Sequence, residues 1–151
     1  MKSMNHLQLV VLLFGFFLIG ACGEAGSGSG GDESGSTAQS ERPEPPEEFA
    51  NLNNPHEGQS EAISEGESLY QANCSSCHGT GGEGDGPASA GLNPKPQNLA
   101  QTQASLNDGY LYWRISEGGL MEPFNSVMPA WRGILEQDQI WQIVSLIRTF
   151  E

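Results

Sequence analysis

The feature that most constrains this chain is one short segment, which reads Cys74-Ser75-Ser76-Cys77-His78. Two thiols separated by two residues and followed at once by an imidazole form the attachment signature of haem c. In such a site the thiols add to the vinyl groups along one porphyrin edge, and the histidine binds the iron. The segment therefore predicts one covalent haem c, held by Cys74 and Cys77, with His78 as the proximal iron ligand.

Two other kinds of site use a closely spaced cysteine pair. A structural zinc ion needs four ligands, commonly a second cysteine pair or a histidine pair. The other histidines, His6 and His56, fall in segments that we expect to lie outside the compact domain. A thioredoxin-like dithiol sits near a βαβ pattern, and no strand pattern is evident here. Haem attachment is therefore the favoured interpretation.

Residues 1–21 predict an export signal. A basic start with Lys2 precedes an apolar run from Leu7 to Ile19. That run is short for the ~30 Å hydrocarbon core of a bilayer and has the length of the apolar part of a signal peptide. A shortened transmembrane anchor is the alternative.

The segment Ile19-Gly20-Ala21-Cys22 resembles the cleavage site of bacterial lipoproteins. The resemblance implies that Cys22 is lipidated after cleavage. The protein would then be anchored to a bacterial membrane and face the periplasm or the cell exterior. Two or three acyl chains give stable anchoring, because a single chain is marginal. This accounts for all three cysteines, one with lipid and two with haem, so we expect no disulfide.

Residues 22–58 predict a linker, rich in Gly and Ser up to residue 40 and then acidic and rich in Pro. Neither half carries enough apolar surface to offset the entropy of ordering it. The whole chain has 19 acidic residues against 6 Lys and Arg, for a formal net charge of -13. This charge argues against nucleic acid as a partner and favours redox partners with a basic docking patch. Solubility of an exported protein is the simpler explanation of the acidic linker.

Residues 59–151 predict one small all-α domain. The helices expected from apolar spacing and end signals cover residues 60–73, 107–117 and 136–150. Ser60 is the expected cap of the first helix, and residues 79–98 hold too much Gly and Pro for a long element. A domain of this size is small for a core built from protein alone. We therefore expect the haem to supply the missing apolar centre.

The domain resembles class I c-type cytochromes, in particular the bacterial single-haem type with a Gly-x-Gly-Asp-Gly-Pro loop after the haem motif. Here that loop covers residues 82–87. In the first helix, Gly66 and Tyr70 have the family's spacing, which implies that Gly66 lets the N- and C-terminal helices cross closely. The resemblance implies the cytochrome c fold around one haem, in an electron carrier rather than an enzyme.

The same resemblance implies that a methionine near the start of the last helix is the distal iron ligand. Met128 is followed by Pro129 and, two residues later, by Trp131, which matches the family's Met-Pro-x-aromatic pattern. Met121 is the alternative. A thioether ligand raises the reduction potential relative to a second histidine, and two protein ligands leave no open position at the iron. This favours electron transfer over catalysis.

The surroundings of the haem are less defined by the sequence. A ligating histidine usually donates its second ring N–H to a backbone carbonyl. By resemblance this carbonyl lies in the Pro-containing loop, where Pro87 and Pro94 both qualify. The candidates for contact with the haem carboxylates are Trp113, Arg114, Trp131 and Lys95.

The expected function is one-electron relay between a respiratory or photosynthetic donor complex and a terminal acceptor, by a cytochrome tethered to a membrane. One alternative is a fixed haem subunit of a larger respiratory complex. The other is a haem enzyme or gas sensor with a labile sixth ligand.

Overall fold

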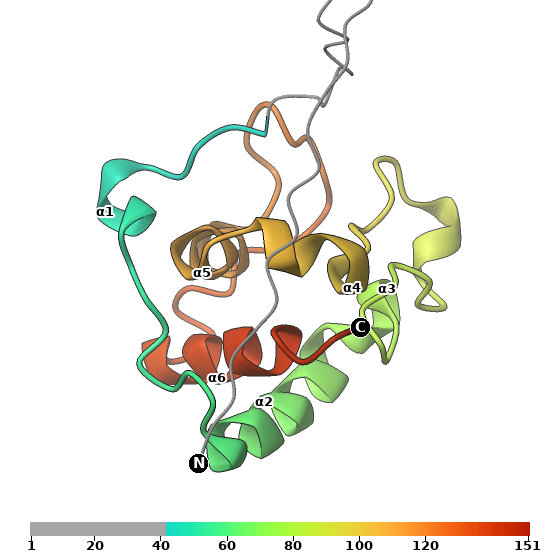
Figure 1. The fold of residues 1–151 in the computed structure, drawn as a ribbon. Coiled ribbons are helices and arrows are strands. Elements are labelled where there is room, and N and C mark those ends of the chain that lie inside the picture. The colour runs from blue at the N-terminus through green and yellow to red at the C-terminus, as the bar shows by residue number, and fades with distance from the viewer. Residues whose placement is uncertain (1–41) are drawn as a thin grey trace, which may run out of the picture. The chain divides into compact units, whose positions relative to one another are not determined.

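The computed structural model describes residues 42–151, which form a helical domain (Figure 1). Its α-helices are α1 (Glu47–Ala50), α2 (Ser60–Asn73), α3 (Ser75–His78), α4 (Leu99–Thr102), α5 (Asp108–Glu117) and α6 (Gln137–Ile147). Two 3-10 turns, η1 (Ser89–Gly91) and η2 (Gln103–Ser105), lie between them. Within this range the β-type pairing is limited to one isolated bridge between Arg132 and Leu135. The all-α prediction is confirmed.

Several predicted features lie outside the described residues. They are the signal peptide at residues 1–21, the lipid-bearing Cys22 and the Gly/Ser-rich part of the linker. In the part of the chain that the structure describes, no helix is long and apolar enough to cross a bilayer. The export signal and the lipid anchor therefore stay predictions from the sequence.

Helices α2 and α6 cross in close contact at Gly66 (Figure 1). A Cβ atom on Gly66 would lie 2.1 Å from the backbone carbonyl oxygen of Gln142, so the crossing has room for glycine alone. The predicted role of Gly66 is confirmed. The predicted cap is wrong by one residue, because Gln59 occupies the cap position of α2 and Ser60 is its first helical residue.

Helices α5 and α6 supply most of the apolar core. The fully or almost fully buried side chains of α6 are Ile140, Ile143, Val144 and Ile147. Helix α5 begins at Asp108, one residue after the predicted start, because Asn107 is its cap and its side chain accepts a hydrogen bond from the backbone N–H of Tyr110 at 2.7 Å. Helix α6 ends at Ile147 rather than at residue 150, since the last residues tighten into a turn in which Phe150 N–H donates to the Ile147 carbonyl.

The predicted linker extends too far toward the C-terminus. Residues 42–59, here called the strap, pack on the helical domain instead of hanging free. Phe49 on α1 is only 7% exposed and its ring lies 6.2 Å from that of Tyr112 on α5. Helix α1 approaches α5 so closely that a Cβ on Gly109 would lie 1.9 Å from the Phe49 carbonyl oxygen. The acidic, Pro-rich composition concealed this, because an average over the segment hides a single buried aromatic ring, which contributes a large apolar area.

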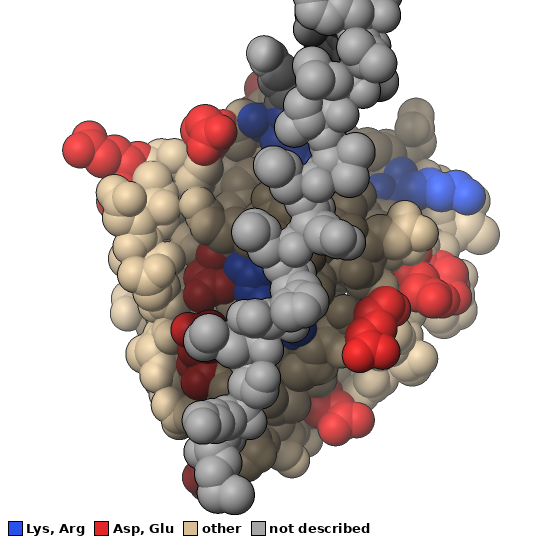
Figure 2. Space-filling model, in the orientation of Figure 1, with Lys and Arg blue, Asp and Glu red and all other residues tan. Residues whose placement is uncertain are grey.

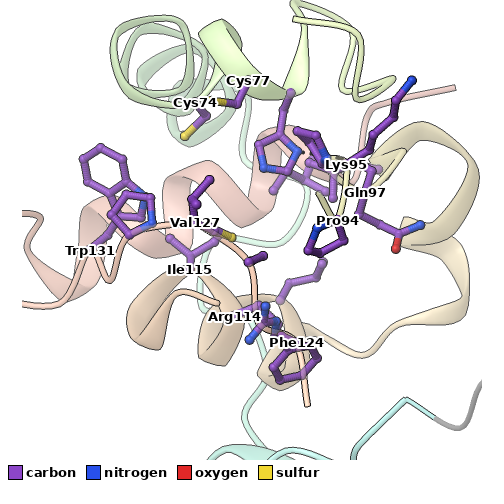
Figure 3. Close-up of a pocket in the computed structure, with 18 of the residues that line it drawn as sticks. Cys74, Cys77, Pro94, Lys95, Gln97, Arg114, Ile115, Phe124, Val127 and Trp131 are labelled. Atoms are coloured by element: carbon purple, nitrogen blue, oxygen red, sulfur yellow. Dashed lines mark hydrogen bonds between the residues drawn. The ribbon is translucent and has the colours of Figure 1, made fainter. Parts of the chain in front are cut away.

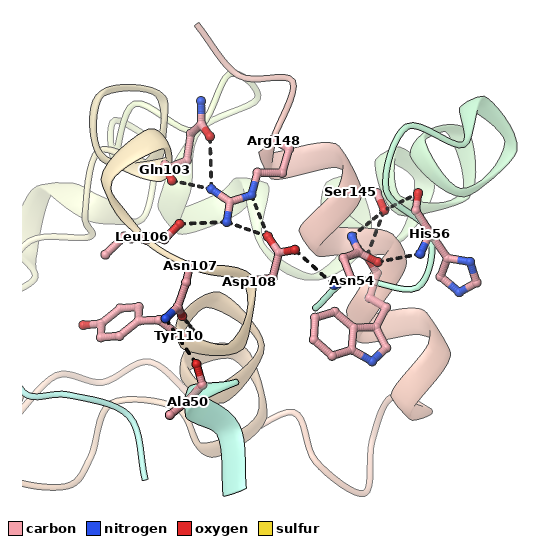
Figure 4. Close-up of polar contacts among 11 residues, drawn as sticks. Ala50, Asn54, His56, Gln103, Leu106, Asn107, Asp108, Tyr110, Ser145 and Arg148 are labelled. Carbon is pink, nitrogen blue, oxygen red and sulfur yellow. Dashed lines mark hydrogen bonds and ion pairs between the residues drawn. The ribbon is translucent and has the colours of Figure 1, made fainter. Parts of the chain in front are cut away.

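A polar network fixes the C-terminal half of the strap (Figure 4). The backbone N–H of Asn54 donates to Asp108 Oδ2 at 3.0 Å, and its side-chain amide donates to Ser145 Oγ at 2.8 Å. Arg148 Nε donates to the other oxygen of Asp108 at 2.8 Å. The His56 ring forms a further contact of 2.6 Å with Asp138. The strap, α5 and α6 are thereby joined through one set of hydrogen bonds.

Candidate haem site

One helical turn directly after α2 carries the three residues of the haem motif. Cys74 caps α3, and its carbonyl oxygen accepts hydrogen bonds from the N–H groups of Cys77 at 3.1 Å and His78 at 2.9 Å. The backbone N–H of Cys74 in turn donates to Tyr70 in the last turn of α2, at 2.8 Å. All three motif side chains line one cavity, so the local chain geometry presents them together.

The glycine-rich loop after the motif closes the C-terminal end of α3. Gly84 N–H donates to the carbonyl of His78 at 2.8 Å, and Gly86 N–H donates to that of Cys77 at 3.2 Å. A Cβ on Gly86 would lie 2.4 Å from the Ser76 carbonyl oxygen. The loop thus satisfies carbonyls that the short helix leaves without partners, and this explains why glycines occupy it.

The chemistry of the two cysteines differs from that of a redox dithiol. Cys74 and Cys77 do not form a disulfide with each other. Burial raises the pKa of the Cys74 thiol to about 12, with a smaller contribution from Cys77. Thioredoxin-like dithiols work with a lowered cysteine pKa, so the environment of Cys74 is the opposite of what that chemistry requires.

Across residues 42–151, no three Cys, His, Asp or Glu side chains gather into a metal-binding cluster.

The His78 imidazole is oriented by a backbone carbonyl. Its Nδ1 lies 3.4 Å from the carbonyl oxygen of Gln97. This contact assigns the ring proton to Nδ1 and leaves Nε2 free as a ligand. Burial lowers the pKa of His78, partly opposed by the Gln97 contact, and so favours the neutral ring that binds metals. The sequence proposed Pro87 or Pro94 for this carbonyl, and the structure corrects the partner to Gln97.

Met128 reaches the cavity from the segment between α5 and α6. Gly119 N–H donates to the Met128 carbonyl at 2.9 Å, and Ser126 N–H donates to the Gly119 carbonyl at 2.8 Å. Gly118 has a φ of +69°, and a Cβ there would lie 2.6 Å from the Met128 carbonyl oxygen. The Gly118-Gly119 pair that ends α5 therefore lets the Met128 segment lie directly against it.

Met121 occupies a different place. It does not line the cavity, and its sulfur accepts a contact from Arg114 Nη1 at 3.6 Å. The same Arg114 nitrogen donates to the Gly118 carbonyl at 2.6 Å, and its guanidinium carbon lies 3.4 Å from the centre of the Phe124 ring. The sulfur of Met121 thus contacts Arg114 rather than the cavity.

The cavity has a volume of about 480 Å³ (Figure 3), within the range of ordinary cofactor sites. Most of its wall is apolar. Ile115 on α5 and Ile143 and Ile147 on α6 contribute to it, and Trp131 reaches it from the segment between those helices. This apolar wall would bury a flat hydrophobic ring system in the space that the small core does not fill.

Three cations also line the cavity, namely Arg42, Lys95 and Arg114. Among the described residues of the wall, none is Asp or Glu. Burial lowers the pKa of Arg114, since charge is costly to desolvate. Of the predicted candidates for haem carboxylate contact, Trp131 lines the cavity and Trp113 does not, because Trp113 packs in the core against Phe124 and Tyr110.

Sequence reasoning missed two residues of the site. Gln97 acts through its backbone, which no side-chain pattern reveals. Arg42 fell inside the predicted linker, although one signal was available, because it is the only Lys or Arg in residues 22–58. A single cation in a long acidic stretch was an indication that the position has a specific partner.

These residues fit a haem c. Two thiols are spaced by one helical turn, a neutral imidazole is oriented beside them, and a thioether lies in the same wall. The apolar cavity matches the porphyrin, and the three cations match its carboxylates.

Comparisons with known proteins agree with this fit. Residues 61–147, more than half of the chain, match the family model described as cytochrome c oxidase, cbb3-type, subunit III. The chain is also similar to the crystal structure of cytochrome cL from the marine methylotrophic bacterium Methylophaga aminisulfidivorans MPT. The two share 30% identity with a TM-score of 0.50, over 72% of this chain and 69% of that one.

A weaker likeness joins the chain to a reducing HAO-like protein complex of Kuenenia stuttgartiensis, with 21% identity and a TM-score of 0.47 over 58% of this chain and 43% of that one. The comparison with curated protein sequences gave no match. The family match covers the haem motif, the glycine-rich loop and the methionine segment together. The chain therefore belongs to the cytochrome c family of electron-transfer proteins, with a cbb3-type subunit III domain, and it carries covalent haem c.

Proposed function

We propose that the chain is a membrane-tethered, single-haem electron relay, in which Cys74 and Cys77 bind the haem covalently while His78 and Met128 are its two axial ligands. The observation that carries the proposal is that these four side chains line one apolar cavity. Its electrons come from a respiratory or photosynthetic donor complex and go to a terminal acceptor.

The choice of Met128 over Met121 rests on their positions. Met128 lines the cavity, whereas the Met121 sulfur lies outside its wall and contacts Arg114. Hydrogen bonds from Gly119 N–H to the Met128 carbonyl and from Ser126 N–H to the Gly119 carbonyl hold the backbone of this segment in place. A ligand on a backbone held in this way needs little rearrangement when the charge at the iron changes, which suits rapid electron transfer.

Two protein ligands also define what the site does chemically. With His78 and Met128 both bound to it, a haem iron in this cavity would have no open position for a substrate. A thioether ligand raises the reduction potential relative to bis-histidine ligation. His78 keeps its proton on Nδ1 toward Gln97. The chain's own groups therefore favour outer-sphere electron transfer.

The tether is proposed from the sequence. Lipid on Cys22 holds the chain to a bacterial membrane, with the domain facing the periplasm or the cell exterior. The charge of the domain bears on its partners. Figure 2 shows acidic side chains at several separate places on one face of the molecule, and the whole chain has a net charge of -13. Redox partners with a basic docking patch fit this surface.

The test of the ligand assignment is a matched pair of variants in the full-length holoprotein, Met128→Ala and Met121→Ala. We expect Met128→Ala to abolish the spectral signature of methionine ligation and to lower the midpoint potential. Met121→Ala should retain both, because its sulfur contacts Arg114 instead. An unchanged spectrum and potential in Met128→Ala would refute the assignment.

A fixed subunit of a larger oxidoreductase complex is the second candidate. The description of the matching family, which names a subunit of a cytochrome c oxidase, favours it. Extraction of the native membrane in mild detergent, followed by purification through a tag on the chain, distinguishes the two. A relay comes away alone, whereas a fixed subunit brings stoichiometric partners with it.

A further inference from the structure

The wall of the haem cavity includes residues that precede the family's domain. The family match begins at residue 61, yet Arg42 and Pro43 line the cavity beside residues of α5 and α6. They form the start of the strap, which the sequence alone assigned to a linker. A segment outside the range of the family match thus contributes directly to the site.

Packing of the strap determines where Arg42 lies. Pro45, three residues further on, is buried. Phe49 inserts its ring into the core next to Tyr112, and the side chain of Asn54 is hydrogen-bonded to Ser145 on α6. With a buried residue so close to it, Arg42 has a restricted range of positions.

The cations of the described residues divide into two groups. Arg132 and Arg148 form ion pairs with Glu117 and Asp108. Within residues 42–151, no carboxylate forms an ion pair with Arg42, Lys95 or Arg114, and these are the three cations that line the cavity. Three cations around one cavity, none of them in an ion pair with a carboxylate of the described residues, indicate an anionic ligand group in it.

The neighbourhood of Tyr110 agrees with this placement. Burial raises the pKa of the Tyr110 phenol, the positive charges of Arg114 and Arg42 oppose the rise, and the negative charge of Glu44 adds a smaller contribution to it. Arg42 is therefore close enough to the α5 side of the cavity to act on the same groups as Arg114.

We propose that the strap delivers Arg42 to the carboxylates of the haem, as a third cation beside Lys95 and Arg114, and that Arg42 thereby adjusts the reduction potential. The inference rests on the haem site proposed above. A positive charge near the haem stabilises the reduced state, which carries one positive charge less than the oxidised state, and so raises the potential. The segment that connects the domain to its predicted tether would then also be a part of the redox centre.

The test uses the full-length holoprotein and the variant Arg42→Gln, with Arg132→Gln as the matched control. Both variants remove one positive charge, but Arg132 lies outside the cavity wall and pairs with Glu117. The midpoint potential is measured by spectroelectrochemical titration at low salt. We expect Arg42→Gln to lower the potential by clearly more than Arg132→Gln, and Arg42→Lys to restore most of the difference. Equal shifts in the two glutamine variants would overturn the proposal.

The dependence on salt provides a second readout. The Debye length falls from about 30 Å at 0.01 M to about 3 Å at 1 M ionic strength. The excess shift of Arg42→Gln should therefore shrink as salt is added, because Arg42 is exposed at the rim. A shift that is independent of salt would mean a structural change rather than a lost charge, and would count against the proposal.

The role of the strap is tested by a double-mutant cycle with Phe49→Ala, which weakens its docking. If the strap positions Arg42, the Arg42→Gln shift becomes small in the Phe49→Ala background. An undiminished shift would show that Arg42 reaches the haem without the strap. The optical spectrum distinguishes this failure from a failure of the ligand assignment, because loss of Met128 ligation changes the spectrum and loss of Arg42 does not.

Discussion

The hydroxyl of Tyr70 donates a hydrogen bond to the backbone carbonyl oxygen of Gly79 at 3.0 Å. Tyr70 belongs to α2, and Gly79 begins the loop that closes the haem motif. The ring of Tyr70 also packs edge-on against Phe150, with 5.3 Å between the centroids. One side chain thus ties the first helix to both the haem motif and the C-terminal end of the chain.

The burial of the Tyr70 phenol predicts that the stability of the domain falls at high pH. Burial raises the pKa of the Tyr70 phenol in the folded chain, whereas an unfolded tyrosine has a pKa of about 10. Above about pH 10 the unfolded chain releases the proton and the folded chain retains it, so stability is lost as pH rises.

Tyr70→Phe should reduce this loss of stability at alkaline pH. At neutral pH it should lower the free energy of unfolding by about 1 kcal/mol, because a hydrogen bond is missing. Denaturant titrations between pH 7 and pH 11, a range that brackets the ordinary tyrosine pKa of about 10, measure both effects. Burial also raises the pKa of Tyr110, so part of the slope should persist. An alkaline slope equal to that of the wild type would contradict the prediction.

The close crossing of α2 and α6 predicts that alanine is far more destabilising at Gly66 than at Gly91. Gly66→Ala places a Cβ at 2.1 Å from the Gln142 carbonyl oxygen, which is fixed in α6. The helices must move apart, and we expect a loss of about 1–3 kcal/mol in the free energy of unfolding. Gly91→Ala is the control, since a Cβ there meets nothing within 4 Å and should change stability by less than about 0.5 kcal/mol. Denaturation followed by circular dichroism makes the comparison.

Docking of the strap predicts that residues before the family's domain contribute to stability. Phe49→Ala removes a ring that is 7% exposed and should cost about 3 kcal/mol. Leu52→Ala, at a side chain that is 36% exposed, should cost clearly less. Limited proteolysis provides the second measurement, with faster cleavage between residues 42 and 59 in Phe49→Ala alone. Equal stability of the two variants would mean that the strap is not docked in solution.

The proposed ligation of the haem iron by His78 and Met128 predicts resistance to carbon monoxide. With His78 and Met128 both bound, the reduced protein should not bind carbon monoxide at neutral pH. Met128→Ala should bind it readily, and Met121→Ala should behave as the wild type. Difference spectra of the dithionite-reduced proteins give the answer. Ready binding by the wild type would favour a gas sensor or haem enzyme with a labile sixth ligand.

The sequence by itself determined what depends on short-range spacing. The two thiols and the imidazole of Cys74, Cys77 and His78 lie within one helical turn, so their joint presentation to one cavity follows from local geometry. The helix formed by Ser60–Asn73 matches the pattern of its apolar residues, and so do most of the other two predicted helices. Gly66 was identifiable because a glycine in the middle of a helix is costly unless a close contact requires it.

Only the tertiary structure decided the features that join distant parts of the chain. It selected the Gln97 carbonyl for His78, placed Met121 beside Arg114, and brought Arg42 from a predicted linker into the cavity wall. Composition averaged over the strap concealed the single ring of Phe49 that docks it. The physical reason is twofold. Backbone acceptors carry no residue-specific signal in the sequence. The cations that face a cavity are decided by how the packed helices bring together residues far apart in the sequence.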